Sequence, residues 1–399
     1  MEILGTNIWA VIGFAFAAYA VVGNDALQTL GTFINSNRRL PWWVLYLFAV
    51  SILLVTFYWG WQITQGDVSW GKLDKVSKFP VFEVHWYHVL PPMVLLLLTR
   101  LGIPVSTTFM VLATFATLSG MYSMLTKSLM GYGVAFITGG LIYAALAPTL
   151  ERWFLKTADT QHNPIWVILQ WVTTGYLWGV WLIQDFANIF VYLPRNLPET
   201  FNVGGEIVQA TSKSAQAILD KCTELSAGQA DAIDACLSSV SIASRTQNLS
   251  FLNASLGMAL IAVFLLITFA NRGGPVQKIL LTKTSVTDIR SATVIDFIYA
   301  SLLFVFSGNL QDFGVPISKV PMSTTWVFLG LIAGREFAIA TLDKVRTTGA
   351  TAKIVGMDLA KATLGIVISV ALALSMPYLA QQFNGNSDEI SSPLEMPSQ

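Results

Sequence analysis

The sequence predicts an all-α polytopic membrane protein with about ten hydrophobic segments, and three observations lead to this class. Of the 399 residues, 54% are hydrophobic and only 12% are charged, whereas a soluble domain carries about 25% charged residues. The apolar residues form runs of about 20, the length that crosses ~30 Å of hydrocarbon. Acidic and basic residues balance at 23 each. The absence of net charge argues against nucleic acid as a partner and leaves the lipid bilayer as the expected surroundings.

The candidate membrane segments, in chain order, are 7–22, 42–64, 84–102, 104–125, 132–148, 164–193, 250–271, 290–307, 321–342 and 362–380. No Lys or Arg precedes the first segment, and Arg38 and Arg39 follow it. We therefore expect a retained helix with the N-terminus outside, in a plasma (inner) membrane. The fourth segment begins at Pro104, the ninth begins at Pro321, and the first runs into Asn24. These interruptions predict broken or re-entrant helices around a buried site, because unwound backbone at membrane depth needs protein or water partners.

A polar stretch, residues 195–249, separates the sixth segment from the seventh. Its apolar residues recur at helical spacing, which predicts an insert of short helices. The insert holds Cys222 and Cys236, which are too isolated for a metal site and are a candidate disulfide pair on an oxidising side of the membrane. The tail 383–399 is rich in Ser, Asn, Pro and acids, a composition typical of disorder.

Two short motifs each occur twice. One is a Ser-Thr-Thr run that follows Pro and one apolar residue, and its copies are Ser106, Thr107, Thr108 and Ser323, Thr324, Thr325. The other is an Asp with an amide residue before it and another three positions later, and its copies are Asn24, Asp25, Gln28 and Gln184, Asp185, Asn188. Asp and Ser are 81 residues apart in the first half and 138 in the second, or 83 without the 55-residue insert.

This matched spacing predicts an inverted-repeat transporter, because paired repeats with interrupted helices at corresponding positions mark a transporter's midplane site. The expected division is 1–160 as the first membrane repeat, 161–194 with 250–382 as the second, and 195–249 as an extracytoplasmic insert. Inverted repeats place equivalent loops on opposite sides of the membrane. The loop with Arg38 and Arg39 is expected inside, so the insert is expected outside.

The residue types in these motifs suit an oxyanion and a cation. Hydroxyl groups beside the unpaired N–H groups of a helix start favour an anion, so both Ser-Thr-Thr runs are candidate oxyanion ligands. Asp25 and Asp185 with their amides offer oxygen ligands to Na⁺, or a carboxylate to a proton. A phosphate dianion beside both carboxylates brings about four negative charges together, and each pair repels by kcal/mol at an effective dielectric of about 20. We therefore expect symport with Na⁺ or H⁺ and no further cofactor.

At these motifs the sequence resembles the inorganic phosphate transporters of the PiT family. Residues 22–32 are similar to that family's Gly-Ala-Asn-Asp-Val-Ala-Asn motif, down to the closing Gly31 and Thr32, and residues 102–108 are similar to its Pro-Val-Ser-Thr-Thr-His motif. The resemblance implies an inverted-repeat fold, phosphate held by the Ser-Thr-Thr helix ends, and Na⁺ or proton symport. It also implies four cation ligands, namely Asn24, Asp25, Asp185 and Asn188.

The chain departs from the family pattern at several positions. Gln28 and Gln184 stand where the family has Asn, Phe109 and Trp326 replace the usual His, and Val191-Tyr192 replace a closing Gly-Thr. Sulfate or another small solute on the same scaffold therefore remains an alternative substrate, an anion channel is a further alternative, and a homo-oligomer is compatible with the pattern. An enzyme is not expected, because the three histidines lie in loops or at segment edges and both cysteines lie in the insert.

Overall fold

The structure is a computed structural model that describes residues 2–3, 6–100, 105–146, 152–157, 163–210, 214–271, 289–342 and 347–384. The α-helices of this part of the chain are α1 Ile8–Asn24, α2 Ala26–Ser36, α3 Trp42–Ile63, α4 Leu90–Arg100, α5 Leu118–Leu146, α6 Arg152–Lys156, α7 Pro164–Phe190, α8 Ser214–Leu225, α9 Ala230–Ser239, α10 Phe251–Ala270, α12 Ile289–Val305, α13 Thr324–Leu342 and α14 Thr348–Asn384. Shorter helical pieces are η1 Trp86–Val89, η2 Thr108–Leu112, η3 Ala113–Phe115 and η6 Gln311–Phe313. The strands are β1 Glu2–Ile3, β2 Thr6–Asn7, β3 Pro198–Val203, β4 Glu206–Gln209 and β5 Ser241–Arg245.

Six helices are long and apolar enough to cross a membrane: Trp42–Ile63, Leu118–Ala145, Pro164–Phe190, Phe251–Ala270, Thr324–Leu342 and Thr348–Phe383. A seventh span results if α1 and the Thr29–Ser36 part of α2, which are bent by 53° at their junction, are counted together. The predicted class, an all-α polytopic membrane protein, is confirmed. The predicted tail lies outside the described residues from 385 on, and its first two residues complete α14.

Two predicted segments, 104–125 and 132–148, divide differently in the structure. The first begins with a short helical piece, 107–115, that includes the π-helical turn η2 and ends where Ala116 is extended. α5 then runs without interruption through Lys127, which the sequence analysis placed between two segments. The helix tolerates this lysine because its Nζ donates to the carbonyls of Ser318 at 2.6 Å and Val320 at 2.7 Å.

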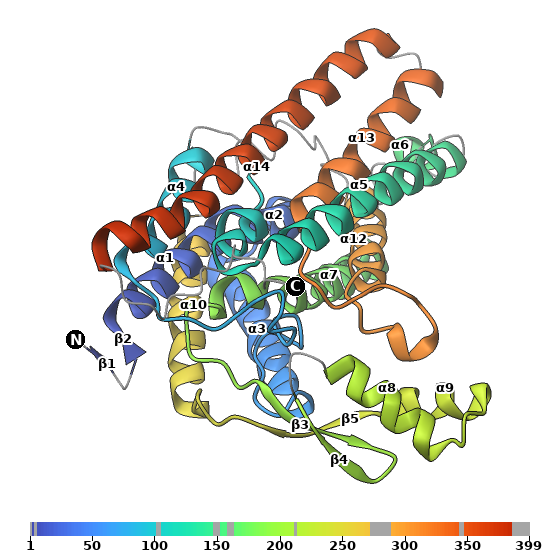
Figure 1. Cartoon of the computed structure of the whole chain (residues 1–399). Coiled ribbons are helices and arrows are strands. Elements are labelled where there is room, and N and C mark those ends of the chain that lie inside the picture. The colour runs from blue at the N-terminus through green and yellow to red at the C-terminus, as the bar shows by residue number, and fades with distance from the viewer. Residues whose placement is uncertain are drawn as a thin grey trace.

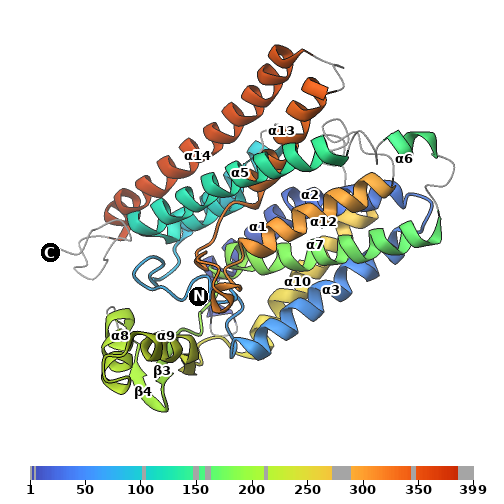
Figure 2. The ribbon, with the colours of Figure 1, turned by 90° about the vertical axis from the view of Figure 1, so that its right-hand side faces the viewer.

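The helices form two groups that are visible as separate layers in Figure 2. One group contains α5 and α13, packed against each other, with α14 along α13. In the other group α7 packs against α12, α2 and α3, and α10 packs against α1 and α3. The pieces η2 and η3 contact α14, and η2 also contacts α7. The first Ser-Thr-Thr run therefore lies at the boundary between the two groups.

Glycines allow α5 and α13 to approach closely. A Cβ atom at Gly334 would lie 1.9 Å from the carbonyl oxygen of Phe136, and one at Gly330 would lie 2.4 Å from that of Tyr132. From the α5 side, a Cβ at Gly139 would lie 2.5 Å from the Leu331 oxygen. Small residues four positions apart serve in this way where membrane helices cross with backbones in contact. The crossing fixes α13, and with it the second Ser-Thr-Thr run.

The prediction that the insert consists of short helices is only partly right. The insert also contains an antiparallel sheet of order β4-β3-β5. Strands β3 and β4 form a hairpin in which Val203 pairs with Glu206. Between them Gly204 and Gly205 have φ of 58° and 89°, and two central residues with positive φ define a tight hairpin turn. Helices α8 and α9 complete the insert, which extends from one end of the helical body (Figure 1).

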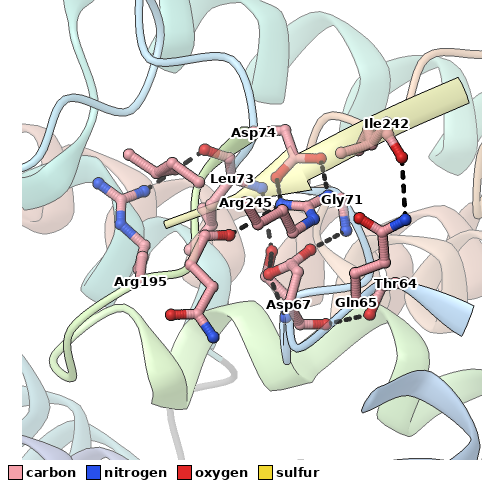
Figure 3. Close-up of polar contacts among 12 residues, drawn as sticks. Thr64, Gln65, Asp67, Gly71, Leu73, Asp74, Arg195, Ile242 and Arg245 are labelled. Atoms are coloured by element: carbon pink, nitrogen blue, oxygen red, sulfur yellow. Dashed lines mark hydrogen bonds and ion pairs between the residues drawn. The ribbon is translucent and has the colours of Figure 1, made fainter. Parts of the chain in front are cut away.

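Two buried arginines dock the insert on the loop between α3 and η1 (Figure 3). Arg245 of β5 contacts both carboxylate oxygens of Asp74, at 2.8 and 3.0 Å. Arg195 donates to the carbonyl of Phe79 at 3.0 Å and to that of Pro80 at 2.7 Å. In the same loop Asp67 accepts from the N–H and hydroxyl of Ser69 and from the N–H of Gly71. Contacts with the insert and contacts within the loop therefore hold the loop in a defined conformation.

Candidate functional site

The predicted site side chains are buried together in the helical body. Eleven of the twelve are at most 6% exposed: Asn24, Asp25, Ser106, Thr107, Thr108, Gln184, Asp185, Asn188, Ser323, Thr324 and Thr325. The twelfth, Gln28, falls in α2, and its side chain lies outside the described residues, as does Pro104. Polar groups buried to this extent in a membrane helix bundle require partners or a ligand.

In the first half, the Ser-Thr-Thr run contacts its own Asp motif. Thr107 donates from its hydroxyl to Asp25 at the junction of α1 and α2. Asn24 donates from Nδ2 to Asp25 Oδ1 at 2.6 Å and to the Val105 carbonyl at 3.2 Å. The break between α1 and α2 is thus joined to the start of the short helical piece 107–115 through side chains of both motifs.

The second half repeats these contacts. Thr324, the middle residue of its run, donates from Oγ1 to Asp185 Oδ2 at 3.2 Å. Asn188 donates from Nδ2 to the other carboxylate oxygen of Asp185. Asn188 lies three residues after Asp185 on α7, a spacing that puts both side chains on one helix face.

The serines play one common role. Ser106 Oγ accepts from the N–H of Phe109 at 3.2 Å, and Ser323 Oγ accepts from the N–H of Trp326 at 3.2 Å. Each serine therefore caps the helical segment that it begins, in the manner of an N-cap residue. The serines and the middle threonines of the two runs thus form corresponding bonds, whereas the amide that donates to the Asp precedes it in the first half and follows it by three residues in the second.

Contacts also cross between the halves. Asn188 donates from Nδ2 to Thr107 Oγ1 at 3.3 Å and to Thr108 Oγ1 at 3.2 Å. Thr108 donates in turn to the carbonyl of Met322, next to Ser323, at 3.1 Å. All four predicted motifs therefore meet in one region, although they are spread over 300 positions of the sequence.

Three site side chains keep a buried polar atom without a hydrogen-bond partner among the described residues. Two are amide oxygens, Gln184 Oε1 and Asn188 Oδ1, which flank Asp185 on α7. The third is the Thr325 hydroxyl, at the start of α13. An unmet buried polar group costs ~1–3 kcal/mol and calls for an explanation, of which a ligand is one. Amide and carboxylate oxygens suit a cation, and a hydroxyl beside a helix start can donate to an anion.

A stripe of α12 lines this region, and the sequence analysis did not identify it. Tyr299 donates from its hydroxyl to the Thr324 carbonyl at 3.1 Å, and the Leu303 carbonyl accepts from Gln184 Nε2 at 2.9 Å. Two residues past the end of α12, the Ser307 carbonyl accepts from Lys72 Nζ at 3.0 Å. Tyr299 and Leu303 are four residues apart, so they lie on one face of α12.

Two further buried charged residues lie outside the four motifs and were not predicted from the sequence. Lys72 is 2% exposed although it lies in a loop, and its local sequence carries no signal of burial. Asp296 of α12 is 3% exposed and accepts from Thr174 at 2.8 Å and from Thr32 at 3.4 Å. The latter had a visible signal, an acid inside an apolar segment, but it has no counterpart in the duplicated motifs.

In the insert, Cys222 of α8 and Cys236 of α9 form a disulfide, with 5.6 Å between their Cα atoms. Cys222 is fully buried. The bond joins the two helices of the insert, far along the chain from the Ser-Thr-Thr runs, and it makes no contact with the site.

No protein-family model matches this chain, and no curated protein matches it. Among solved structures, one similar chain is described as "The sodium-dependent phosphate transporter". The two chains are 17% identical and superpose with a TM-score of 0.48, over 93% of this chain and 98% of the other. A likeness at this level supports no statement about function.

Proposed function

We propose that this integral multi-pass membrane protein is a secondary active transporter of inorganic phosphate, or of a similar tetrahedral oxyanion, by symport with Na⁺ or H⁺. The observation that carries the proposal is the set of unpartnered atoms at the meeting point of the four motifs. Among the described residues, the amide oxygens of Gln184 and Asn188, which flank Asp185, have no donor. The hydroxyl of Thr325, which follows the adjoining helix start, has no partner in the same part of the chain. One buried region thus offers oxygen acceptors to a cation and a hydroxyl donor to an anion.

The proposed roles follow from the bonding. Ser106, Thr107, Thr108, Ser323, Thr324 and Thr325 supply hydroxyls and helix-start N–H groups to the oxyanion. Asp25 and Asp185 carry the charge that the coupling cation meets, and their neighbours Asn24, Gln28, Gln184 and Asn188 supply amide oxygens. Because Thr107 and Thr324 lie at the helix starts and donate to the carboxylates, a cation at either Asp can influence the oxyanion ligands directly.

Coupling follows from electrostatics. Asp25 and Asp185 are each at most 1% exposed, so a phosphate dianion beside them adds charge of the same sign in a poorly solvated region. Two like charges 4 Å apart repel by about 4 kcal/mol at an effective dielectric of 20. A cation bound between carboxylate and oxyanion turns this repulsion into attraction. The oxyanion is therefore expected to bind weakly without the cation, which is the requirement for symport.

The two motif pairs support an inverted-repeat arrangement, and Arg38 and Arg39 after the first span support an N-terminus and an insert on the outer side of a plasma (inner) membrane. Alternating access would then expose the site to each side in turn by movement of one helix group against the other. The site lies at the boundary between the two groups, where η2 contacts α7 and α14. Movement of one group against the other would therefore change access to the site.

Uptake by reconstituted protein tests the proposal. Purified protein in liposomes is given ³²P-phosphate with an inward Na⁺ gradient, an inward proton gradient, or neither, with choline replacing Na⁺. We expect accumulation above equilibrium with one of the gradients, and its loss when an ionophore dissipates that gradient. Equilibration of phosphate without dependence on either gradient would indicate a channel instead. Accumulation of ³⁵S-sulfate but not of phosphate would show that sulfate is the substrate instead of phosphate.

A further inference from the structure

Lys72 brings a buried positive charge to the site from outside the four motifs. It lies in the loop between α3 and η1, is 2% exposed, and donates from Nζ to the Ser307 carbonyl at 3.0 Å. Ser307 lies two residues past the end of α12 at Val305 and four residues past Leu303, whose carbonyl accepts from the side chain of Gln184. The ammonium is therefore bound to the segment that directly follows the part of α12 in contact with the Asp185 motif.

Three charged groups act on this ammonium, namely Asp185 of α7, Asp67 and Lys319. Burial lowers the pKa of Lys72 to about 7, and the carboxylate of Asp185 opposes that change more strongly than does Asp67. Lys319 adds repulsion, and the charge of Lys72 in turn acts on Lys127 of α5. Among these groups Asp185 is the strongest attractive partner of Lys72, although the two residues are 113 positions apart.

We propose that Lys72 is a fixed positive charge of the central site, which weakens cation binding at Asp185 and strengthens oxyanion binding beside it. The inference rests on the proposed function and deepens it, by naming a positioning residue that sets the cation affinity. The physical reason is that a nearby ammonium partly neutralises the carboxylate of Asp185 and repels a cation that binds there. A unit charge at ~10 Å, at an effective dielectric of about 20, changes an affinity by roughly tenfold.

Lys127 provides a control, because it is also a buried lysine that donates to backbone carbonyls but has a different charged neighbour. It is 5% exposed and also holds the segment between α12 and α13, through the carbonyls of Ser318 and Val320. The charge that acts on Lys127 is that of Lys72 rather than that of Asp185. Loss of either lysine removes a buried ammonium and its backbone contacts, but only loss of Lys72 removes the positive charge that opposes Asp185.

The experiment compares wild type, Lys72→Met, Lys72→Arg and Lys127→Met in proteoliposomes. The Na⁺ concentration for half-maximal ³²P-phosphate uptake is measured at pH 6 and pH 8, and gel filtration checks that each protein is monodisperse. Protons compete with Na⁺ at both carboxylates in all four proteins, so the comparison between variants isolates Lys72. Wild type should need more Na⁺ at pH 6, where Lys72 is charged, than at pH 8.

Lys72→Met should lower the half-maximal Na⁺ concentration roughly tenfold at pH 6, raise the half-maximal phosphate concentration, and reduce the pH dependence of the Na⁺ value. Lys72→Arg should keep the Na⁺ requirement high at pH 8, because a guanidinium stays charged there. Lys127→Met should behave as wild type.

A Lys72→Met protein with the wild-type Na⁺ requirement at both pH values would overturn the inference. So would a Lys72→Arg protein with the full pH dependence of wild type, an outcome that decides the matter even if Lys72→Met fails to fold. Equal loss of uptake in Lys72→Met and Lys127→Met, with wild-type behaviour of Lys72→Arg, would assign both lysines a purely structural role. Absence of any gradient-driven uptake by wild type would instead refute the proposed function itself.

Discussion

Asn188 of the second Asp motif donates to Thr107 of the first Ser-Thr-Thr run, with 3.3 Å between Nδ2 and Oγ1. Thr107 in turn donates to Asp25, and Asn188 also donates to Asp185. The two carboxylates are therefore linked through one threonine and one asparagine, which come from different halves of the chain. A change in the protonation or cation occupancy of one Asp can therefore reach the other through three hydrogen bonds.

Replacement of either carboxylate should abolish coupling. Asp25→Asn and Asp185→Asn keep the side-chain shape but remove the charge that a cation meets, so each should lose gradient-driven phosphate uptake while remaining folded. The readouts are ³²P uptake in proteoliposomes and gel filtration in detergent.

Asp296→Asn is the matched control for this experiment. Asp296 is also a buried helical carboxylate, but its partner Thr174 lies 11 residues before Asp185, ~16 Å along the helix. This variant should keep gradient-driven uptake. If both motif variants transported phosphate at the wild-type rate, the proposed role of the carboxylates would be wrong.

Thr325→Val should weaken oxyanion binding without loss of stability. The Thr325 hydroxyl is buried without a partner among the described residues, so its replacement by a methyl group of similar size removes an unmet polar group. We expect the melting temperature to stay the same or rise, because such a group costs ~1–3 kcal/mol, while the half-maximal phosphate concentration rises about tenfold or more.

Thr293→Val is the control, since that buried hydroxyl donates to the Ile289 carbonyl of its own helix at 2.8 Å. It should leave phosphate affinity unchanged. A clear fall in stability of Thr325→Val, with unchanged phosphate affinity, would mean that the hydroxyl has a structural partner instead of a ligand.

Gly334→Ala should destabilise the protein sharply. The added Cβ would lie 1.9 Å from the Phe136 oxygen, a backbone atom that cannot move unless α5 separates from α13. Gly356→Ala is the control, because nothing lies within 4 Å of its Cβ position in α14. Alanine there should be neutral or stabilise the helix by up to ~1 kcal/mol. Thermal unfolding in detergent distinguishes the two, and equal melting temperatures would contradict the proposed close crossing.

Arg245→Met should loosen the insert from the helical body. The Arg245 side chain is 2% exposed and pairs with Asp74, and removal of one partner from a buried pair costs about 3–5 kcal/mol. We expect faster cleavage of the insert in limited proteolysis. Lys221→Met removes a solvent-exposed pair with Glu206 at 2.6 Å and should leave the cleavage rate unchanged. Equal cleavage rates for the two variants would show that Arg245 does not hold the insert.

The disulfide makes the side of the insert measurable. If the insert lies outside, a membrane-impermeant thiol reagent should label intact cells only after mild reduction, because Cys222 and Cys236 are bonded to each other. A Cys222→Ser, Cys236→Ser double variant is the negative control. Labelling that requires cell lysis would place the insert in the cytoplasm and reverse the proposed topology.

The sequence was informative where function depends on local pattern. Asp25 and Asp185, with the runs at Ser106 and Ser323, are recognisable because each motif is a few adjacent residues and each occurs twice at matched spacing. The strands of the insert were missed, since their apolar residues also fitted helical spacing. Their hairpin is set by the backbone of Gly204 and Gly205, which a periodicity argument does not weigh.

By itself, then, the sequence determined that the chain is a membrane protein and which twelve side chains belong to the duplicated motifs. The length of an apolar segment and the residues of a short motif are properties of contiguous residues, so they can be recognised without knowledge of the fold. Only the tertiary structure decided that the side-chain oxygens of Gln184, Asn188 and Thr325 have no hydrogen-bond partner within the described ranges. It also decided that Lys72 bonds Ser307, 235 positions away. Such facts depend on which groups the packing brings within hydrogen-bond distance, and no local pattern records that.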